Sequence, residues 1–523
     1  MNELQTDVLI LGDGLSGLAA AFTAAGAGRK VLLASRGGCA SPAVIGFSCA
    51  AGIGDTPDAF AADMPKAGAG LNSKALVDVF TSGTRALPDW LTALGMELDC
   101  RDGTPELMRS LGHSTARLVH HGLSTGRECM EKLEEKLSEL PVQRLREHCC
   151  LSLRTAGGIT GAFLFDLKNS CVLSVRARAV VLATGGCHIA ARSTYPEELT
   201  GDGFALAYQA GASLADLEFI QHEPLRCVDK RIGLSTTMLA EGGVLRNREG
   251  KRFILDSYEN EAVPTKDELS RLIAMEIAGG HGTEKGGVFA DLTGLDETAV
   301  AHHRRIYDRF AKNGMDLRTD RIEVKPAAHS IMGGVLIRPD CGTEVDGLYA
   351  AGEVTGGLHG ASRLGGNAGS ETLVMGMIAG SHAASYDGAA HADGDGAEFE
   401  RWIRKLLKKP VYVPSLTVLR DRALEAMAQG MGPVRTKEGI EKTLSSLDTC
   451  AQALNDTGIA SPDRLPKYME LGNLLLTARI ACLGALHRQE SRGAHARLDY
   501  PDQWDRPVHF VFQKDRGMSK TEE

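Results

Sequence analysis

A glycine turn close to the N-terminus constrains the fold more than any other feature. The β-branched and aliphatic residues 6–11 run into Gly12, Gly14 and Gly17, and a helix-like segment and a second apolar strand follow by residue 34. In such a βαβ unit the first glycine permits a tight turn and the second lets the backbone approach a pyrophosphate. The third lets the helix pack on the strand, with its N-terminus facing the anion. The sequence therefore predicts an α/β fold that opens with a Rossmann-like dinucleotide-binding unit.

The position that usually grips an adenosine ribose carries no acid. About 20 residues after the glycines, where an acid is usual, the chain has Ser35 and Arg36. We therefore expect the Ser35 hydroxyl to take over this contact. Farther along, an apolar strand at residues 179–183 ends in Thr184 and Gly185, which suits the far side of a dinucleotide.

A second glycine-rich turn carries charged side chains. Five glycines between Gly356 and Gly366 let backbone amides approach a flat cofactor and its substrate closely. Within the same turn, Arg363 offers a planar fork that matches a carboxylate. An arginine there is hard to explain by structure alone, so this turn is the strongest indication of function.

Composition limits the classes of partner. Fifty-eight basic and 67 acidic residues give a net charge of −9 without a long basic run, which argues against nucleic acid. No run of 18 apolar residues, basic leader or cleavage site occurs, so we expect a cytoplasmic protein without a direct membrane span. Twelve scattered cysteines lack the spacing of haem, zinc or cluster sites and indicate a reducing compartment.

The 523 residues are enough for two or three domains. Residues 151–178 predict a hairpin, and from about 223 to 330 the βα rhythm breaks around a helical pattern at 266–277. Residues 387–398, rich in Asp, Gly and Ala, predict a linker, and long helical periodicities follow to residue 488. Residues 514–523 predict a frayed polar tail.

Several further motifs occur in a characteristic order. They are His113-Ser, Thr125-Gly-Arg-Glu, Ala183-Thr-Gly-Gly, Thr200-Gly-Asp-Gly, Glu241-Gly-Gly, His329-Ser-Ile-Met-Gly-Gly and Glu490-Ser-Arg-Gly-Ala-His495. With the two glycine turns they resemble the flavoprotein family of fumarate reductase, succinate dehydrogenase and L-aspartate oxidase, from residue 7 to about 504. The resemblance implies a Rossmann-like FAD-binding domain (1–222 and 335–386), an inserted α+β capping domain (223–334), a C-terminal helical domain (395–505) and a tail (506–523).

The cofactor implied by this resemblance is FAD. The implied contacts are Gly12, Gly14 and Gly17 at the pyrophosphate, Ser35 and Arg36 near the adenosine, Asp202 near the cofactor, Glu353 on ribityl or ribose hydroxyls, and Gly46, Thr184, Gly185 and Asn367 elsewhere along it. Some members bond the flavin covalently through a histidine. Residues 37–52 contain none, so we expect noncovalent FAD.

The resemblance also implies an anion clamp. His329 and Arg363 fall where the family holds one end of a dicarboxylate, and Ser235 falls where a hydroxyl assists. An arginine fork and an imidazole fix a carboxylate by charge-assisted hydrogen bonds and hold the reacting carbon beside the flavin. The rival interpretation is that Arg363 and His329 only bind the flavin or pack the domain interface.

The chain departs from the family in its proton chemistry. Leu239 stands where an arginine should donate a proton, and Thr236 stands where a glutamate should relay it. Fumarate reduction by the usual route is therefore not expected. Where the family has a substrate-contacting histidine, this chain has Glu223, preceded by His222. Either Glu223 faces solvent, or it points into the pocket and abstracts a proton or pairs with a substrate ammonium.

These observations favour an FAD-dependent oxidoreductase that moves hydride between flavin N5 and a small carboxylate-bearing substrate. Two alternatives stay open: an amino-acid oxidase of the L-aspartate type, and a noncatalytic or electron-relay flavoprotein subunit. An iron-sulfur or other electron-transfer subunit is a possible partner in each case. No metal site is predicted, because His120, His121, His281, His302 and His303 lack ligand spacing with acids or cysteines.

Overall fold

Strand β1 (Asn2–Leu11) lies in the middle of a seven-stranded sheet in the computed structural model, which describes residues 2–110, 112–122, 124–261, 264–388 and 396–522. Its side chains alternate between the two faces. Val8 and Ile10 belong to the core formed with α1 (Leu15–Gly26), and Leu9 and Leu11 belong to the core on the other face. Burial on both faces explains the unbroken apolar run in the sequence.

The sheet has the order β8-β2-β1-β11-β10-β9, with β18 beside β11. Its other strands are β2 (Val31–Ala34), β8 (Val142–Leu145), β9 (His148–Thr155), β10 (Ile159–Asp166), β11 (Cys171–Leu182) and β18 (Leu348–Ala350). The predicted hairpin at 151–178 is present, since β10 pairs antiparallel with β9 and with β11, but the separate strand expected at 179–183 is the end of β11. Residues 171–182 form one strand, because β1 pairs with it continuously from Leu173 to Leu182.

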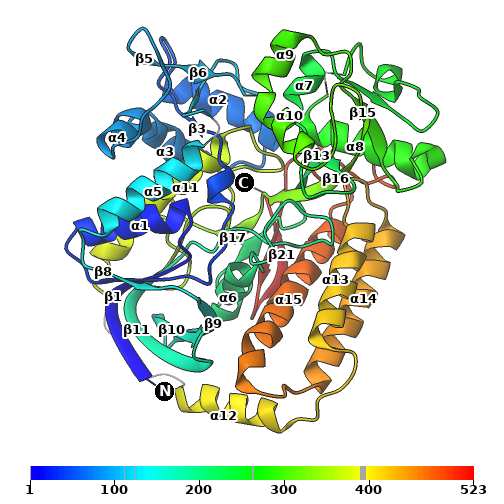
Figure 1. The fold of residues 1–523 in the computed structure, drawn as a ribbon. Coiled ribbons are helices and arrows are strands. Elements are labelled where there is room, and N and C mark those ends of the chain that lie inside the picture. The colour runs from blue at the N-terminus through cyan, green and yellow to red at the C-terminus, as the bar shows by residue number, and fades with distance from the viewer. Residues whose placement is uncertain (1, 111, 123, 262–263, 389–395, 523) are drawn as a thin grey trace.

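Helices α1, α5 (Thr125–Leu137) and α11 (Asn367–Ser385) cover one face of this sheet (Figure 1). Helices α1 and α11 touch through small residues: a Cβ on Gly380 would lie 2.3 Å from the Ala20 carbonyl oxygen. The smaller elements above the sheet are η1 (Ser41–Ala43), β3 (Phe47–Ser48), α2 (Pro57–Gly68), α3 (Lys74–Thr84), α4 (Leu87–Ala93), β4 (Cys100–Arg101), β5 (Thr104–Pro105), β6 (Leu107–Met108) and β7 (Leu118–Val119).

The inserted segment forms a separate lobe with its own apolar core, drawn in green in Figure 1. Its antiparallel sheet has the order β13-β16-β15-β14. The elements are β13 (Ile220–Cys227), α7 (Thr237–Ala240), β14 (Val244–Arg246), η2 (Phe253–Asp256), α8 (Lys266–Glu276), η3 (Ile277–His281), β15 (Val288–Asp291), α9 (Glu297–His302), α10 (Arg304–Ala311) and β16 (Ile322–Ile331). The predicted start of this domain, residue 223, falls inside β13; the domain limits stay a prediction.

The C-terminal region is helical, with α12 (Gly396–Lys408), α13 (Leu416–Gly430), α14 (Lys437–Asp456), η4 (Pro462–Arg464) and α15 (Leu465–His487). Of the predicted linker, residues 389–395 lie outside the described residues, and 396–398 are already helical. Residues Pro462–His487 are the one helical stretch in the described part of the chain that could cross a membrane by length and composition. Of its most apolar window, 61% is buried inside the protein, where α15 packs on α14.

The prediction of a frayed tail was wrong. Strands β20 (His509–Gln513) and β21 (Gly517–Thr521) form a hairpin, and β20 pairs with β12 (Leu214–Ala215). The resulting five-stranded sheet is completed by β17 (Gly334–Leu336) and β19 (Thr355–Gly356). Phe510 and Phe512 lie on the same side of β20 and are buried, which anchors the hairpin. The remaining helix, α6 (Asp202–Ala210), comes after β11 in the chain.

The arrangement is a Rossmann-like α/β domain, an inserted α+β cap and a C-terminal helical region, which confirms the predicted fold class.

Candidate active site

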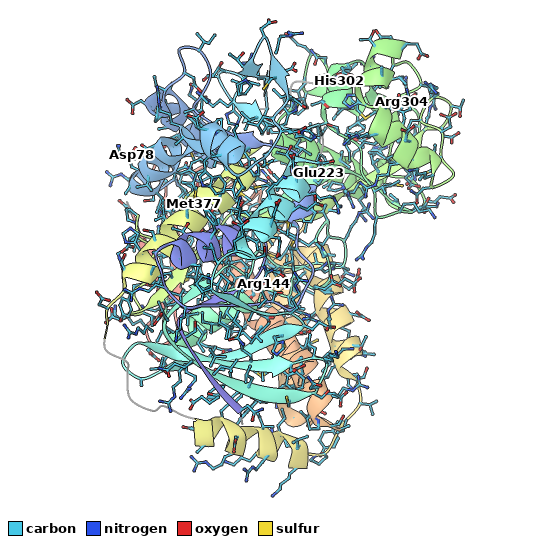
Figure 2. All side chains as sticks on the ribbon, turned by 60° about the vertical axis from the view of Figure 1, so that its left-hand side comes forward. Asp78, Arg144, Glu223, His302, Arg304 and Met377 are labelled. Atoms are coloured by element: carbon cyan, nitrogen blue, oxygen red, sulfur yellow. The ribbon has the colours of Figure 1, made fainter. Side chains whose placement is uncertain are left out.

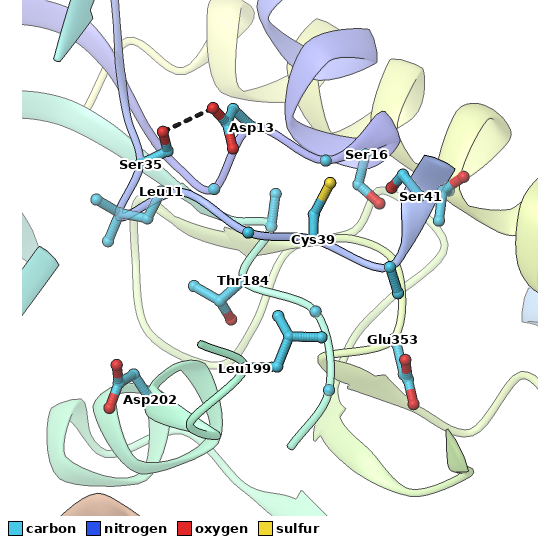
Figure 3. Close-up of a pocket in the computed structure, with 18 of the residues that line it drawn as sticks. Leu11, Asp13, Ser16, Ser35, Cys39, Ser41, Thr184, Leu199, Asp202 and Glu353 are labelled. Atoms are coloured by element: carbon cyan, nitrogen blue, oxygen red, sulfur yellow. Dashed lines mark hydrogen bonds between the residues drawn. The ribbon is translucent and has the colours of Figure 1, made fainter. Parts of the chain in front are cut away.

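A long pocket opens where β1 and β2 end and α1 begins. It is lined by the first glycine turn, by residues 34–41 and by segments 183–186 and 198–202 (Figure 3). Glu353 and Arg363 of the second glycine-rich region line the same pocket. Crevices at the carboxyl ends of parallel strands are where α/β sheets bind nucleotides.

The first glycine turn tolerates no side chain at two of its positions. Gly12 has a φ of 110°, and a Cβ there would lie 2.2 Å from the Ala183 carbonyl oxygen. A Cβ on Gly17 would lie 1.8 Å from the Gly12 carbonyl oxygen, so α1 packs directly on the turn. Gly14 is the N-cap of α1 and lines the pocket, and the next amide, Leu15 N–H, donates to Ser41 Oγ at 3.0 Å, so an anion at this helix N-terminus would meet the Ser41 hydroxyl as well.

The end of the pocket near β2 contains more charge than the sequence indicated. Ser35 Oγ donates to Asp13 Oδ2 at 2.7 Å (Figure 3), so the hydroxyl expected to hold the ribose already serves a carboxylate. Arg36 forms an ion pair with Glu470 of α15. Burial raises the pKa of Glu470 to about 7, against the opposing charge of Arg36. Asp13 and Glu470 were not singled out from the sequence.

The middle of the pocket contains one buried hydroxyl without a partner in the described part of the chain. Thr184 Oγ1 makes no hydrogen bond to any described residue, and Gly185 beside it has a φ of 71°. Asp202, which lines the pocket, accepts from Thr200 Oγ1 and Asn473 Nδ2, both at 2.7 Å. Burial raises the pKa of Asp202, although these hydrogen bonds oppose the change.

Glu353 is held at the pocket wall by several donors. Its Oε1 accepts from Ser330 Oγ at 2.9 Å, from Ile331 N at 3.1 Å and from the Tyr195 hydroxyl. Burial raises its pKa to about 8, against the Ile331 hydrogen bond and the charge of Arg363. At neutral pH the carboxyl is therefore largely protonated and can donate as well as accept, which suits a sugar hydroxyl.

Two predicted cofactor residues lie outside the pocket lining. Gly46 packs against the neighbouring strand, since a Cβ there would lie 2.6 Å from the Val119 carbonyl oxygen. Asn367 is fully buried at the start of α11, and neither its amide nitrogen nor its amide oxygen has a hydrogen-bond partner within the described ranges. Only its neighbour Ala368 lines the pocket. The roles predicted for Gly46 and Asn367 stay predictions.

His329 and Arg363 lie close enough for the charge of Arg363 to lower the pKa of His329, although only Arg363 is part of the pocket lining. His329 Nδ1 lies 2.9 Å from Thr194 Oγ1, and burial lowers its pKa to about 4, against the charge of Glu223. The Arg363 side chain is half-buried; among the described residues its buried Nε has no hydrogen bond, and its Nη1 donates to the Leu364 carbonyl oxygen at 3.2 Å. The side chain thus keeps donor capacity to spare, which a ligand carboxylate would satisfy.

Glu223 does not face solvent. Its side chain is 14% exposed and accepts from Lys266 Nζ at 2.6 Å. Burial alone would raise the pKa of Glu223, but the charges of Lys266 and His329 lower it overall. His222, one residue earlier on β13, is buried on the other side of the strand, and burial lowers its pKa to about 3. Lys266, the first residue of α8, was not singled out from the sequence.

The other two cap positions do not join this cluster. Ser235 Oγ lies 2.6 Å from Thr237 Oγ1 within its own turn, and in the described residues it has no hydrogen bond to His329 or Arg363. Leu239 is buried in the core of the cap. The residue at the expected acid position therefore has a packing role, and the role predicted for Ser235 stays a prediction.

The loop that carries Arg363 is fixed from behind by the first domain. Ser48 Oγ donates to the Gly365 carbonyl oxygen at 3.2 Å, and His113 Nε2 lies 2.8 Å from the same atom. Arg117 pairs with Asp55 and Asp63 next to His113, in a fully buried network. The His113 motif therefore positions the clamp loop instead of touching the pocket.

The residues present fit an FAD molecule. A cradle that a Cβ would fill, a helix N-terminus on the pocket lining and the Thr184 hydroxyl, which has no hydrogen bond within the described residues, all suit an extended, hydroxyl-rich anion. Beyond them lie a protonatable carboxyl and the half-buried Arg363. Fold and site together define a dinucleotide-binding flavoprotein of the oxidoreductase class.

Comparison with known proteins identifies the family. Residues 7–368 match the family described as FAD binding domain, and residues 420–518 match fumarate reductase flavoprotein C-term. The chain is 33% identical to a chain of the fumarate reductase (CoM/CoB) of Methanothermobacter marburgensis, with 96% of each chain covered. It is 31% identical to L-aspartate oxidase of Yersinia pestis, covering 97% of this chain and 98% of that one.

Solved structures agree with these sequence relatives. E. coli quinol fumarate reductase superposes with a TM-score of 0.92 at 28% identity, covering 100% of this chain and 97% of that chain. The chain belongs to the fumarate reductase and L-aspartate oxidase flavoprotein family and is an FAD-dependent oxidoreductase of that family.

Proposed function

We propose that this protein transfers hydride between noncovalently bound FAD and a small carboxylate-bearing substrate, with its proton chemistry moved to Glu223 and Lys266. The observation that carries the proposal is Arg363, a half-buried side chain on the wall of the FAD pocket whose Nε has no hydrogen bond among the described residues and whose charge acts on His329. A small anion would satisfy both side chains at once.

The clamp residues are protonated in a way that suits a carboxylate. His329 is neutral at pH 7 because its pKa is about 4. When its Nδ1 accepts the Thr194 hydroxyl hydrogen, its own hydrogen sits on Nε2 and can be donated to a substrate oxygen. Arg363 supplies the charge and the planar fork that fix the orientation.

Bound FAD supplies the exchange of a hydride with one substrate carbon. The adjacent carbon must gain or lose a proton, and neither Leu239 nor Thr236 can move one. Lys266 Nζ carries exchangeable protons, touches Glu223 and is 34% exposed, so its proton can be replaced from solvent. We assign the proton transfer to this pair, with Lys266 as the donor when the substrate is reduced.

The Lys266 contact also bears on the class of substrate. An amino-acid substrate would need the Glu223 carboxylate to meet its ammonium, yet Lys266 already occupies that carboxylate at 2.6 Å. The balance of charge around the clamp therefore favours an unsaturated or saturated carboxylate over an amino acid. An electron-transfer partner and a cytoplasmic location belong to the same proposal.

Anaerobic flavin spectroscopy tests this function. Protein with chemically reduced flavin should be reoxidised by an unsaturated dicarboxylate such as fumarate, read as the return of the yellow absorbance. Bleaching of the oxidised protein by L-aspartate, without a response to enoates, would support the amino-acid oxidase alternative. No response to carboxylates, enoates or amino acids would contradict the proposal and support an electron-relay role.

Replacing Lys266 with methionine should separate proton transfer from binding. We expect turnover to fall about 100-fold or more, because a positioned general acid typically contributes 10²–10⁴-fold. The flavin content should stay at wild-type level, since Lys266 does not line the FAD pocket. Steady-state kinetics of the FAD-loaded variant give the measurement.

Lys285→Met is the matched control for this variant. Lys285 is an exposed lysine of the same lobe, paired with Asp229 at 2.7 Å, so its removal should leave turnover within about twofold of wild type. Equal turnover in the Lys266 and Lys285 variants would remove Lys266 from the reaction.

A further inference from the structure

A cluster of one carboxylate and two imidazoles lies in the cap. Glu241 follows α7, and His302 and His303 lie at the junction of α9 and α10. Glu241 Oε1 lies 2.8 Å from His302 Nδ1, and Glu241 Oε2 lies 3.1 Å from His303 Nε2. One ligand atom from each residue lies within 4.8 Å of the other two. Figure 2 labels His302 in the outer part of the cap, and Glu223 lies at its base.

Part of this cluster has no hydrogen-bond partner. His303 is 8% exposed, yet among the residues that the structure describes its Nε2 makes no hydrogen bond, and the facing Glu241 Oε2, 3.1 Å away, makes none either. The two atoms are close, but their geometry is not that of a hydrogen bond. Leaving such polar atoms buried and unsatisfied costs about 1–3 kcal/mol. A bound cation between them would remove this cost.

The donor set and the spacing suit a divalent transition metal. Two imidazole nitrogens and a carboxylate oxygen form a common three-ligand zinc set, completed by water. Ligands at zinc distances in a tetrahedral site lie about 3.3 Å from each other. The measured 2.8 and 3.1 Å separations need only small adjustments to reach that spacing. His302 is 66% exposed, which gives an ion access from solvent.

We propose that Glu241, His302 and His303 form a binding site for a single Zn²⁺-class ion, separate from the FAD pocket. The ion joins the turn after α7 to the start of α10. Since α7 carries the segment from Thr237 to Ala240, the site fixes one edge of the cap against its helices.

The test uses the full-length, FAD-loaded protein and Zn²⁺ alone as the probe. Isothermal titration calorimetry after chelator treatment should show saturable binding of one equivalent, and Zn²⁺ should raise the thermal unfolding temperature. The variant His302→Asn should weaken binding at least tenfold. It is the informative variant, because His302 is largely exposed and its replacement should not affect folding.

His281→Asn is the matched control. His281 is an exposed cap histidine 3.5 Å from Glu249, without a third ligand. This variant should bind Zn²⁺ as the wild type does. The wild-type protein loaded with Co²⁺ should in addition show visible tetrahedral bands, at wavelengths beyond the flavin absorption, that His302→Asn lacks. Absence of saturable binding, or equal affinity in the His302 and His281 variants, would overturn the proposal.

Discussion

Replacing Arg363 with lysine should nearly abolish turnover while the protein keeps its FAD. Lysine preserves the positive charge but not the planar fork. Its side chain is shorter and meets a carboxylate through a single ammonium group. Loss of one partner in a buried, charge-assisted contact costs about 2–5 kcal/mol, roughly 30-fold to several thousand-fold in kcat/KM. Steady-state kinetics with the carboxylate found by flavin reoxidation, together with the flavin-to-protein ratio, give the measurement.

The flavin ratio separates the two interpretations of Arg363. A variant that loses turnover but stays yellow supports a substrate clamp, whereas a colourless variant supports a role in binding the flavin. Arg231→Lys is the control, because Arg231 is an exposed cap arginine paired with Glu197 at 2.9 Å. It should retain wild-type kinetics. Wild-type kinetics in Arg363→Lys would remove Arg363 from substrate binding.

The largest effect on the cofactor is expected from Gly17→Ala. The new methyl carbon would lie 1.8 Å from the Gly12 carbonyl oxygen, which is backbone and cannot rotate away. Either α1 moves off the turn or the turn opens, and in both cases the cradle for the pyrophosphate is lost. We expect a colourless protein or an insoluble one, measured by flavin content and by circular dichroism of any soluble fraction.

Gly26→Ala is the matched control at the other end of the same helix. A Cβ on Gly26 meets no atom within 4 Å. Alanine is a better helix former than glycine, so this variant should bind FAD normally and gain up to about 1 kcal/mol in stability. A yellow Gly17→Ala protein with one FAD per chain would show that the close packing of α1 on the turn is not required.

Local patterns were enough for the framework of the fold. The apolar run of β1, the glycine turn and the start of α1 lie within a few residues of each other, so their spacing reports their geometry directly. The tail was wrongly predicted for the opposite reason. Its hairpin is stabilised by pairing with β12, almost 300 residues away, and by Phe510 and Phe512 entering a core built mostly from residues distant in sequence.

The candidate active site could likewise be predicted from the sequence only in part. Arg363 and His329 could be named because each lies in a motif that resembles the family, and the loss of the usual acid is visible as Leu239. The replacement could not be named, since Lys266 meets Glu223 across 43 residues of sequence. The sequence also left open whether Glu223 faces solvent or the pocket. The side of β13 on which a residue lies is known only once the strand is paired in its sheet.

The amino-acid sequence by itself determined the nucleotide-binding unit, the order of the three regions and the presence of an arginine where a small anion would be held. Only the tertiary structure decided which charges meet: Arg36 with Glu470, Lys266 with Glu223, and Glu241 with His302, separated by 434, 43 and 61 residues. Periodicity tells which face of an element is buried, whereas the partner across that face depends on how distant segments pack.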